Sequence, residues 1–223
     1  MTSDGISLED VRKELSAGCR VLLLVRHAER PKIAFDDRTF GEALPLTPNG
    51  ERMSVEFGRI MRGAARNVQF RASPLRRTVM TAERIAEGMG LAGAEVEHDA
   101  RIGNDSAYVA SQLEMWRLFS DGSFFERMVE YMRSGEQRGF APLASATDAY
   151  EAYALSTFTG DLGIYATHDV FVAAFLHARG VKTDFCAANW PRFLDSAAIV
   201  VEPSGAVRRA FVRAGLSDLA CGV

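Results

Sequence analysis

RVLLLVRH, residues 20–27, is an almost unbroken apolar run that ends in an arginine and a histidine. Such runs are typical of strands buried on both faces, as in a parallel sheet. Further short strands are predicted at Val68–Ala72, near Glu95–Glu97 and at Gly163–Thr167. We therefore expect an α/β fold, a three-layer α/β/α sandwich with a mostly parallel central sheet.

Helices are expected between these strands because apolar residues recur at helical spacing after clear start signals. An amphipathic helix is predicted at about Leu8–Leu15. Thr47-Pro48 and Ser73-Pro74 each offer an N-cap followed by a first-turn proline. Gly90 ends the helix that Ser73 begins, and Gly180 ends one that spans Val170–Arg179. The tail pairs Ala197–Val201 with Val207–Val212 in a probable hairpin.

The segment between the third and fourth strands is far longer than one crossover helix needs. It contains three stretches with helical spacing, at Ala107–Phe119, Ser123–Met132 and Ala146–Phe158. We expect a helical cap at about residues 99–160, inserted in a single domain that covers residues 1–223.

Composition excludes several classes of function. A net charge of -3 gives no global attraction to nucleic acid or to an anionic membrane. The charged N-terminal segment lacks the apolar core of a signal peptide, and no apolar run reaches the length of a membrane span. Three scattered cysteines, Cys19, Cys186 and Cys221, argue against a disulfide framework. We expect a cytoplasmic protein without nucleic-acid or membrane partners, whose oligomeric state stays open.

Polar residues follow three of the predicted strands directly. Arg26 and His27 come after the first strand, His168 and Asp169 after the fourth, and a segment beginning at Ser73 after the second. The carboxyl ends of parallel strands form one edge, where ligands bind. The cations gathered at this edge are Arg26, Arg30, Arg76, Arg77, His27 and His168.

Such a cluster indicates an anionic ligand, and a phosphoryl group fits it best. Guanidinium groups hold phosphate oxygens in bidentate fashion. One neutral imidazole can attack phosphorus while the other hydrogen-bonds an equatorial oxygen, and Asp169 is placed to protonate the leaving oxygen. His27, His168 and Asp169 could also form a facial metal-ligand set, but adjacent arginines would repel the cation. We expect no metal and no cofactor.

Four motifs in order resemble those of the histidine phosphatase superfamily. They are Arg26-His27, Leu46-Thr47-Pro48-Asn49-Gly50, Ser73-Pro74-Leu75-Arg76-Arg77-Thr78 with Thr81-Ala82, and Thr167-His168-Asp169. The resemblance implies a phosphohistidine intermediate on His27, no metal, and phosphate held by Arg26, Arg30, Arg77 and His168. Arg77 rather than Arg76 takes this role because it occupies the fifth position of the Ser-Pro-Leu-x-Arg pattern.

Two departures from the family pattern bear on function. Ala28 replaces the usual glycine after the nucleophile, which removes access to left-handed dihedrals. The glutamate that donates a proton in the mutase-like branch corresponds to Asn104, with Asp105 beside it, whereas Asp169 matches the acid-phosphatase-like donor. We therefore expect a metal-independent phosphomonoester hydrolase acting on a small phosphorylated metabolite. A phosphomutase and a non-catalytic phospholigand-binding protein are the alternatives, and the proton donor is Asp169 or Asp105.

Several residues also have ordinary structural interpretations. Asp169 is by default a helix N-cap, and His98 and His177 are expected to be structural. The aromatic residues Trp116, Phe119, Phe124 and Phe125 are expected mainly in the core of the cap. Arg117 and Arg127 are weak candidates for binding a second anionic group of the substrate.

Overall fold

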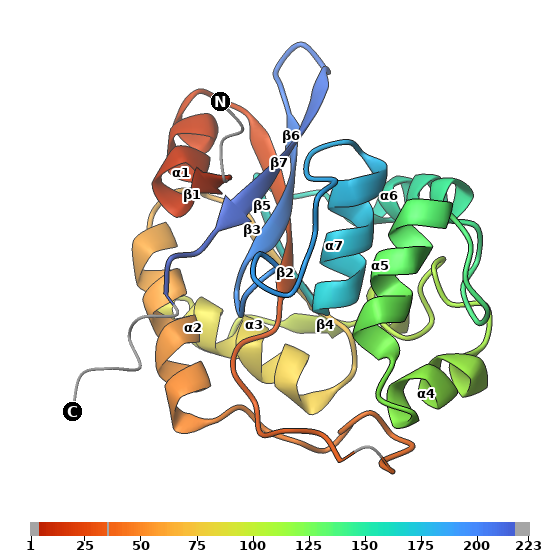
Figure 1. Cartoon of the computed structure of the whole chain (residues 1–223). Coiled ribbons are helices and arrows are strands. Elements are labelled where there is room, and N and C mark those ends of the chain that lie inside the picture. Colours follow the sequence, from red (N-terminus) through yellow and green to blue (C-terminus); the bar gives the residue numbers. More distant parts are fainter. Residues whose placement is uncertain (1–4, 35, 217–223) are drawn as a thin grey trace.

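The computed structural model describes residues 5–34 and 36–216 (Figure 1). Within them, seven strands form one sheet in the order β1-β7-β6-β2-β5-β3-β4. The neighbours β2–β5, β5–β3, β3–β4 and β1–β7 are parallel, and β6 runs antiparallel to β2 and β7. The strands are β1 (Ile6–Ser7), β2 (Arg20–Arg26), β3 (Val68–Ala72), β4 (Val96–His98), β5 (Leu162–Thr167), β6 (Ser196–Val201) and β7 (Val207–Arg213).

Alternate side chains of β2 enter two separate hydrophobic cores. Leu23 and Val25 pack with α1 (Leu8–Ser16), α2 (Pro48–Met61) and α3 (Arg76–Met89). Leu22 and Leu24 pack on the opposite face with α7 (Asp169–Ala178) and with helices from the segment before β5. Figure 1 shows the sheet between these two groups of helices. The expected three-layer α/β/α architecture is confirmed.

The segment between β4 and β5 holds a 3-10 turn (Ala100–Ile102) and three helices, α4 (Gln112–Ser120), α5 (Phe124–Ser134) and α6 (Leu143–Thr157). The first helix begins later than predicted because Ser111 caps it and because Val109 pairs with Phe140. Helices α5 and α6 contribute to the same core as α7 and the sheet. The division into one domain with a cap at about residues 99–160 stays a prediction.

One predicted N-cap is confirmed and two are wrong. The Thr47 hydroxyl accepts from the backbone N–H of Gly50 at 3.0 Å and begins α2. Ser73 caps no helix: α3 begins at Arg76 after Leu75, because the buried Ser73 hydroxyl is engaged elsewhere. Likewise, His168 is the N-cap of α7, and Asp169 is its first helical residue.

Cysteine placement and helix length bear on the compositional expectations. Cys19 is a buried free thiol and Cys186 an exposed one, while Cys221 lies outside the described residues. No helix in the described part of the chain is long and apolar enough to cross a membrane.

Candidate active site

A cavity of about 80 Å³ lies where β2, β3 and β5 end. His27, His168, Arg77, Arg30 and Asp169 line it, so five of the six predicted site residues meet there. Arg26 does not line it. The remaining lining residues come from the loop after β2, the segment before α4, and α4, α5 and α7: Ile33, Phe40, Asn104, Met115, Phe119, Phe124, Val170 and Phe171.

His27 is held in one orientation and one tautomer. Its backbone N–H donates to the carbonyl of Thr167 at 2.9 Å, which ties the end of β2 to β5. Its Nδ1 atom lies 2.8 Å from the carbonyl oxygen of Ala28. A carbonyl can only accept, so Nδ1 carries the proton and Nε2 keeps its lone pair. Burial, followed by the charge of Arg77, holds the pKa of His27 well below its ordinary value. The ring is therefore neutral and able to act as a nucleophile.

The ring of His168 faces that of His27 edge-on, with centroids 5.5 Å apart. Its Nε2 atom lies 3.1 Å from Ser73 Oγ, which in turn lies 2.9 Å from Thr78 Oγ1. Thr78 donates its proton to a backbone carbonyl, of Ser73 or of Leu75. The proton between Ser73 Oγ and Thr78 Oγ1 must therefore come from Ser73. The Ser73 hydroxyl then has no second proton to give, so it accepts from His168 and Nε2 is protonated. Burial, followed by the charge of Arg77, lowers the pKa of His168 well below its ordinary value.

Two arginines present unused donors at the cavity. Arg77 is buried, and its Nη1 atom donates to the carbonyls of Phe40 at 2.9 Å and Gly41 at 3.1 Å. The Nε atoms of Arg77 and Arg30 are buried, and no described residue gives either a hydrogen-bond partner. Burial lowers the pKa of Arg77 to about 10, so its side chain stays charged at neutral pH. Buried cationic N–H groups without partners are costly, and an oxyanion would satisfy them.

The Arg26 side chain forms an ion pair with the carboxylate of Asp169. Its Nη2 atom lies 3.1 Å from Asp169 Oδ2, its Nη1 donates to the Pro191 carbonyl, and its guanidinium stacks on Phe193. Trp190 donates from Nε1 to the same Asp169 oxygen at 3.1 Å. That Arg26 binds phosphate stays a prediction.

The residues that contact Arg26 and Asp169 were not identified from the sequence. Trp190, Pro191 and Phe193 lie in the irregular segment between α7 and β6, and Phe193 lies 5.9 Å from the ring of His27. The gathering of Trp, Pro and Phe in so short a segment is the one signal that could have drawn attention to it.

Ala28 fits its position without strain. Among the described residues, Phe40 and Leu194 are the non-glycine residues with positive φ, so Ala28 does not occupy the left-handed region. Its N–H donates to Thr81 Oγ1 at 3.0 Å, and its methyl group is fully buried. The loss of glycine therefore leaves the loop after His27 intact.

The Leu46–Gly50 motif anchors the same loop. Glu29 accepts hydrogen bonds from Thr47 Oγ1 at 2.7 Å and from Asn49 Nδ2 at 3.0 Å. A Cβ atom at Gly50 would lie 2.2 Å from the Glu29 carbonyl oxygen, so only glycine allows this approach. These contacts tie the start of α2 to the residues directly after the nucleophile.

Other candidate groups lie away from the cavity. Asp105 is exposed, accepts from Gln112 and does not line it, whereas its neighbour Asn104 does. Arg117 pairs with Glu114 on the exposed side of α4, and Arg127 lies on the surface of α5. Phe119 and Phe124, expected mainly in the core of the cap, line the cavity, and Phe124 also packs against that core.

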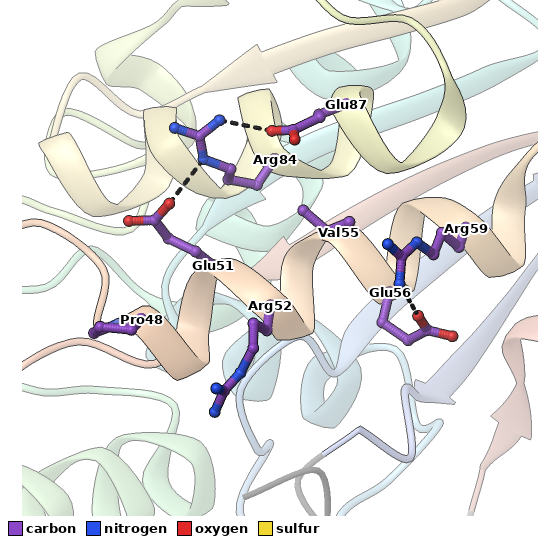
Figure 2. A pocket seen from close by; sticks show the side chains of 8 residues that line it. All are labelled: Pro48, Glu51, Arg52, Val55, Glu56, Arg59, Arg84 and Glu87. Carbon is purple, nitrogen blue, oxygen red and sulfur yellow. Dashed lines mark hydrogen bonds and ion pairs between the residues drawn. The ribbon is translucent and has the colours of Figure 1, made fainter.

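A wider hollow of about 870 Å³ lies on the outer surface of α2 and α3 (Figure 2). Most of its charges pair with one another: Arg84 contacts Glu51 at 3.0 Å and Glu87 at 2.6 Å, and Arg59 contacts Glu56 at 3.2 Å, whereas Arg52 contacts Asn49. These exposed pairs leave little net charge to bind an anion.

The described residues provide no metal-binding cluster at the site. No group of three or more histidine, cysteine or carboxylate side chains in residues 5–34 and 36–216 is arranged to hold a metal ion. In particular, the pairing of Asp169 with Arg26 commits this carboxylate to a cation of the protein itself.

Part of the chain matches a known protein family. Residues 22–104 match the model of the histidine phosphatase superfamily (branch 1), a range that includes His27 and Arg77 and ends before His168. Among curated proteins, none matches the chain by sequence.

Solved structures share the fold at low identity. A phosphoglycerate mutase from Bacillus anthracis str. Sterne has a TM-score of 0.53 at 14% identity, over 87% of this chain and 93% of its own. The native mycobacterial glucosyl-3-phosphoglycerate phosphatase has 0.54 at 16%, over 86% and 97%. A phosphoserine phosphatase variant from Entamoeba histolytica, in complex with phosphoserine, has 0.51 at 14%, over 86% and 95%. The neighbours thus include phosphatases and a mutase.

Proposed function

We propose that the chain is a metal-independent phosphomonoester hydrolase of the histidine phosphatase superfamily, with His27 as its nucleophile. One observation supports this most directly. The bond from His27 Nδ1 to the Ala28 carbonyl leaves Nε2 unprotonated, in a cavity whose buried arginine Nε atoms have no described partner. A free imidazole lone pair beside unused anion donors is what attack on a phosphate ester needs.

The first step transfers the phosphoryl group to the enzyme. His27 Nε2 attacks phosphorus, the bond from phosphorus to the ester oxygen breaks, and a protonated Asp169 gives its proton to the leaving alkoxide. The His27 ring becomes positively charged, and its Nδ1–H bond to the Ala28 carbonyl strengthens with that charge. Arg30 and Arg77 bind the transferring oxygens. His168 joins them once the negative charge of the phosphoryl group favours a second proton on its ring, because its Nε2–H is already donated to Ser73.

The second step returns the enzyme to its starting state. Water attacks phosphorus, the Asp169 carboxylate takes its proton, and the bond from phosphorus to Nε2 breaks to release inorganic phosphate. Asp169 is preferred to Asp105 as the proton donor because it lines the cavity and Asp105 does not.

Brief exposure to a ³²P-labelled ester tests the proposal. We expect label on the protein that is stable to base and labile to acid, and that is absent from His27→Ala. His98→Ala, which removes an exposed histidine outside the cavity, should label as the native chain does. Turnover should persist in a chelator. Absence of label from the native chain, or label in folded His27→Ala, would refute the assignment.

The same experiment separates the alternatives. A phosphomutase would return the label to a second oxygen of the organic product, whereas a hydrolase releases it as inorganic phosphate. A non-catalytic binding protein would acquire no covalent label. Ala28 in place of the family glycine does not favour a non-catalytic protein, because its backbone lies outside the left-handed region.

A further inference from the structure

The mouth of the cavity is apolar on one side, whereas its floor is polar. His27, His168 and Arg77 are buried, while Phe40, Phe119 and Phe124 are partly exposed, as are Arg30 and Asp169. The three rings form a row in edge contact, with centroids 5.7 Å apart for Phe40–Phe119 and 6.1 Å for Phe119–Phe124. Ile33, Met115 and Val170 extend this apolar wall.

The wall is fixed in place. Arg77, at the floor, donates to the backbone carbonyls of Phe40 and Gly41, which holds the loop that carries Phe40. Arg38 of the same loop lies over the ring of Trp116, 4.9 Å from its centroid, and so links the loop to α4. The rings are therefore part of a preformed site.

The cavity brings a substrate into contact with these rings. Its volume is about 80 Å³, and the three rings line the same space as His27, Arg30 and Arg77. A phosphoryl group bound by these residues therefore lies next to the rings. The alcohol part of a bound ester must then lie against Phe40, Phe119 and Phe124.

The side of the mouth that the rings form offers little to a polar alcohol group. Apart from the predicted site residues, of which Arg30 and Asp169 are partly exposed, Asn104 is the one polar side chain among the described lining residues. Neither Arg117 nor Arg127 of the cap lines the cavity, so none of the described cap residues supplies a cation for a substrate carboxylate. Hydroxyl or carboxylate groups placed against the rings would lose their hydrogen bonds to water without replacement.

We propose that the physiological substrates are phosphomonoesters of apolar or aromatic alcohols, an inference that rests on the proposed function. Phe119 and Phe124 determine this preference by binding the alcohol group. Sugar phosphates and phosphoglycerate-type acids are poor substrates.

Three primary alkyl esters test this while keeping the leaving oxygen similar: 3-phenylpropyl phosphate, propyl phosphate and glycerol 1-phosphate. We expect kcat/KM to be at least about tenfold higher for the phenylpropyl ester than for the propyl ester, and lowest for glycerol 1-phosphate. Phe119→Ala and Phe124→Ala should each remove most of the phenylpropyl advantage and leave propyl phosphate nearly unaffected. Phe119→Leu, which keeps apolar surface, should retain part of it.

Leu113→Ala is the matched control, because Leu113 lies on α4 with its side chain 56% exposed and does not line the cavity. It should leave all three rates unchanged. Equal rates for the three esters, or a preference for glycerol 1-phosphate, would overturn this inference while the proposed hydrolase stands. If none of the esters is hydrolysed and no phosphoprotein forms, the proposed function fails, and the inference fails with it.

Discussion

The Nε2 atom of His168 lies 3.1 Å from the hydroxyl oxygen of Ser73, across two strand ends that are far apart in sequence. The serine is itself oriented by Thr78, 2.9 Å away in the first turn of α3. The Ser-Pro-Leu-x-Arg segment therefore contributes more than Arg77 to the site. Its first residue fixes the ring of the second histidine.

Replacing Ser73 by alanine should impair turnover by misaligning His168. The buried Nε2–H would lose its acceptor, a cost of about 1–3 kcal/mol, and we expect kcat to fall about tenfold or more. Steady-state kinetics and thermal unfolding would measure both effects. Ser54→Ala removes a buried hydroxyl that donates to the Gly50 carbonyl on α2, so it should cost stability without lowering kcat. Equal kcat losses in the two variants would argue against a positioning role.

Much of the fold could be predicted because buried parallel strands carry an unmistakable apolar pattern. Val68–Ala72 was predicted with the bounds that the structure has, and β2 and β5 to within a residue or so at each end. Strand β1 was missed because two residues are too short for any periodicity, and its existence depends on pairing with β7.

The site was predictable where it depends on strand order, and not where it depends on side-chain packing. Ends of parallel strands meet, so His27 and His168 could be placed at one edge from sequence. A helical pattern shows that Phe119 is apolar, but not whether it faces a core or a cavity. Nor does spacing reveal that Ser73 turns toward His168 instead of capping α3, or that Trp190 contacts Asp169.

Asp169→Asn should slow poor leaving groups far more than good ones. Alkoxides need a proton from the general acid, so kcat for an alkyl phosphate should fall about 10²–10⁴-fold. Nitrophenolate leaves without one, so kcat for p-nitrophenyl phosphate should fall less than about tenfold. Comparing the two substrates in one variant provides the measurement. Trp190→Phe, which keeps an aromatic ring but removes the N–H donor to Asp169 and part of the indole, should not show this split. A uniform loss on both substrates would mean that Asp169 acts by holding Arg26.

Stability should decrease as the pH falls below about 6.5, the ordinary pKa of histidine. In the folded chain, burial keeps the pKa values of His27 and His168 well below this ordinary value. Below pH 6.5 the unfolded chain therefore binds protons that the folded chain does not. Each histidine then costs up to about 1.4 kcal/mol of stability per pH unit. Urea unfolding at pH 7.5 and 5.5 would measure the change.

His27→Gln should reduce this pH dependence, and the exposed His98→Gln should not. Some dependence will remain, because burial also lowers the pKa of His177. An identical pH slope in native and His27→Gln chains would contradict a neutral, buried His27.

Restoring the family glycine by Ala28→Gly should not raise activity. The backbone at this position lies outside the left-handed region, so the native fold does not use a conformation that only glycine allows. The buried methyl group of Ala28 is part of the hydrophobic core that also contains Leu46 and Met53. Losing that methyl and adding backbone freedom to the unfolded chain should cost about 1 kcal/mol or more of stability. Thermal unfolding and kcat/KM would test both parts. A several-fold rise in kcat/KM would show that Ala28 restrains the loop after His27, and that the native site is held short of its most active geometry.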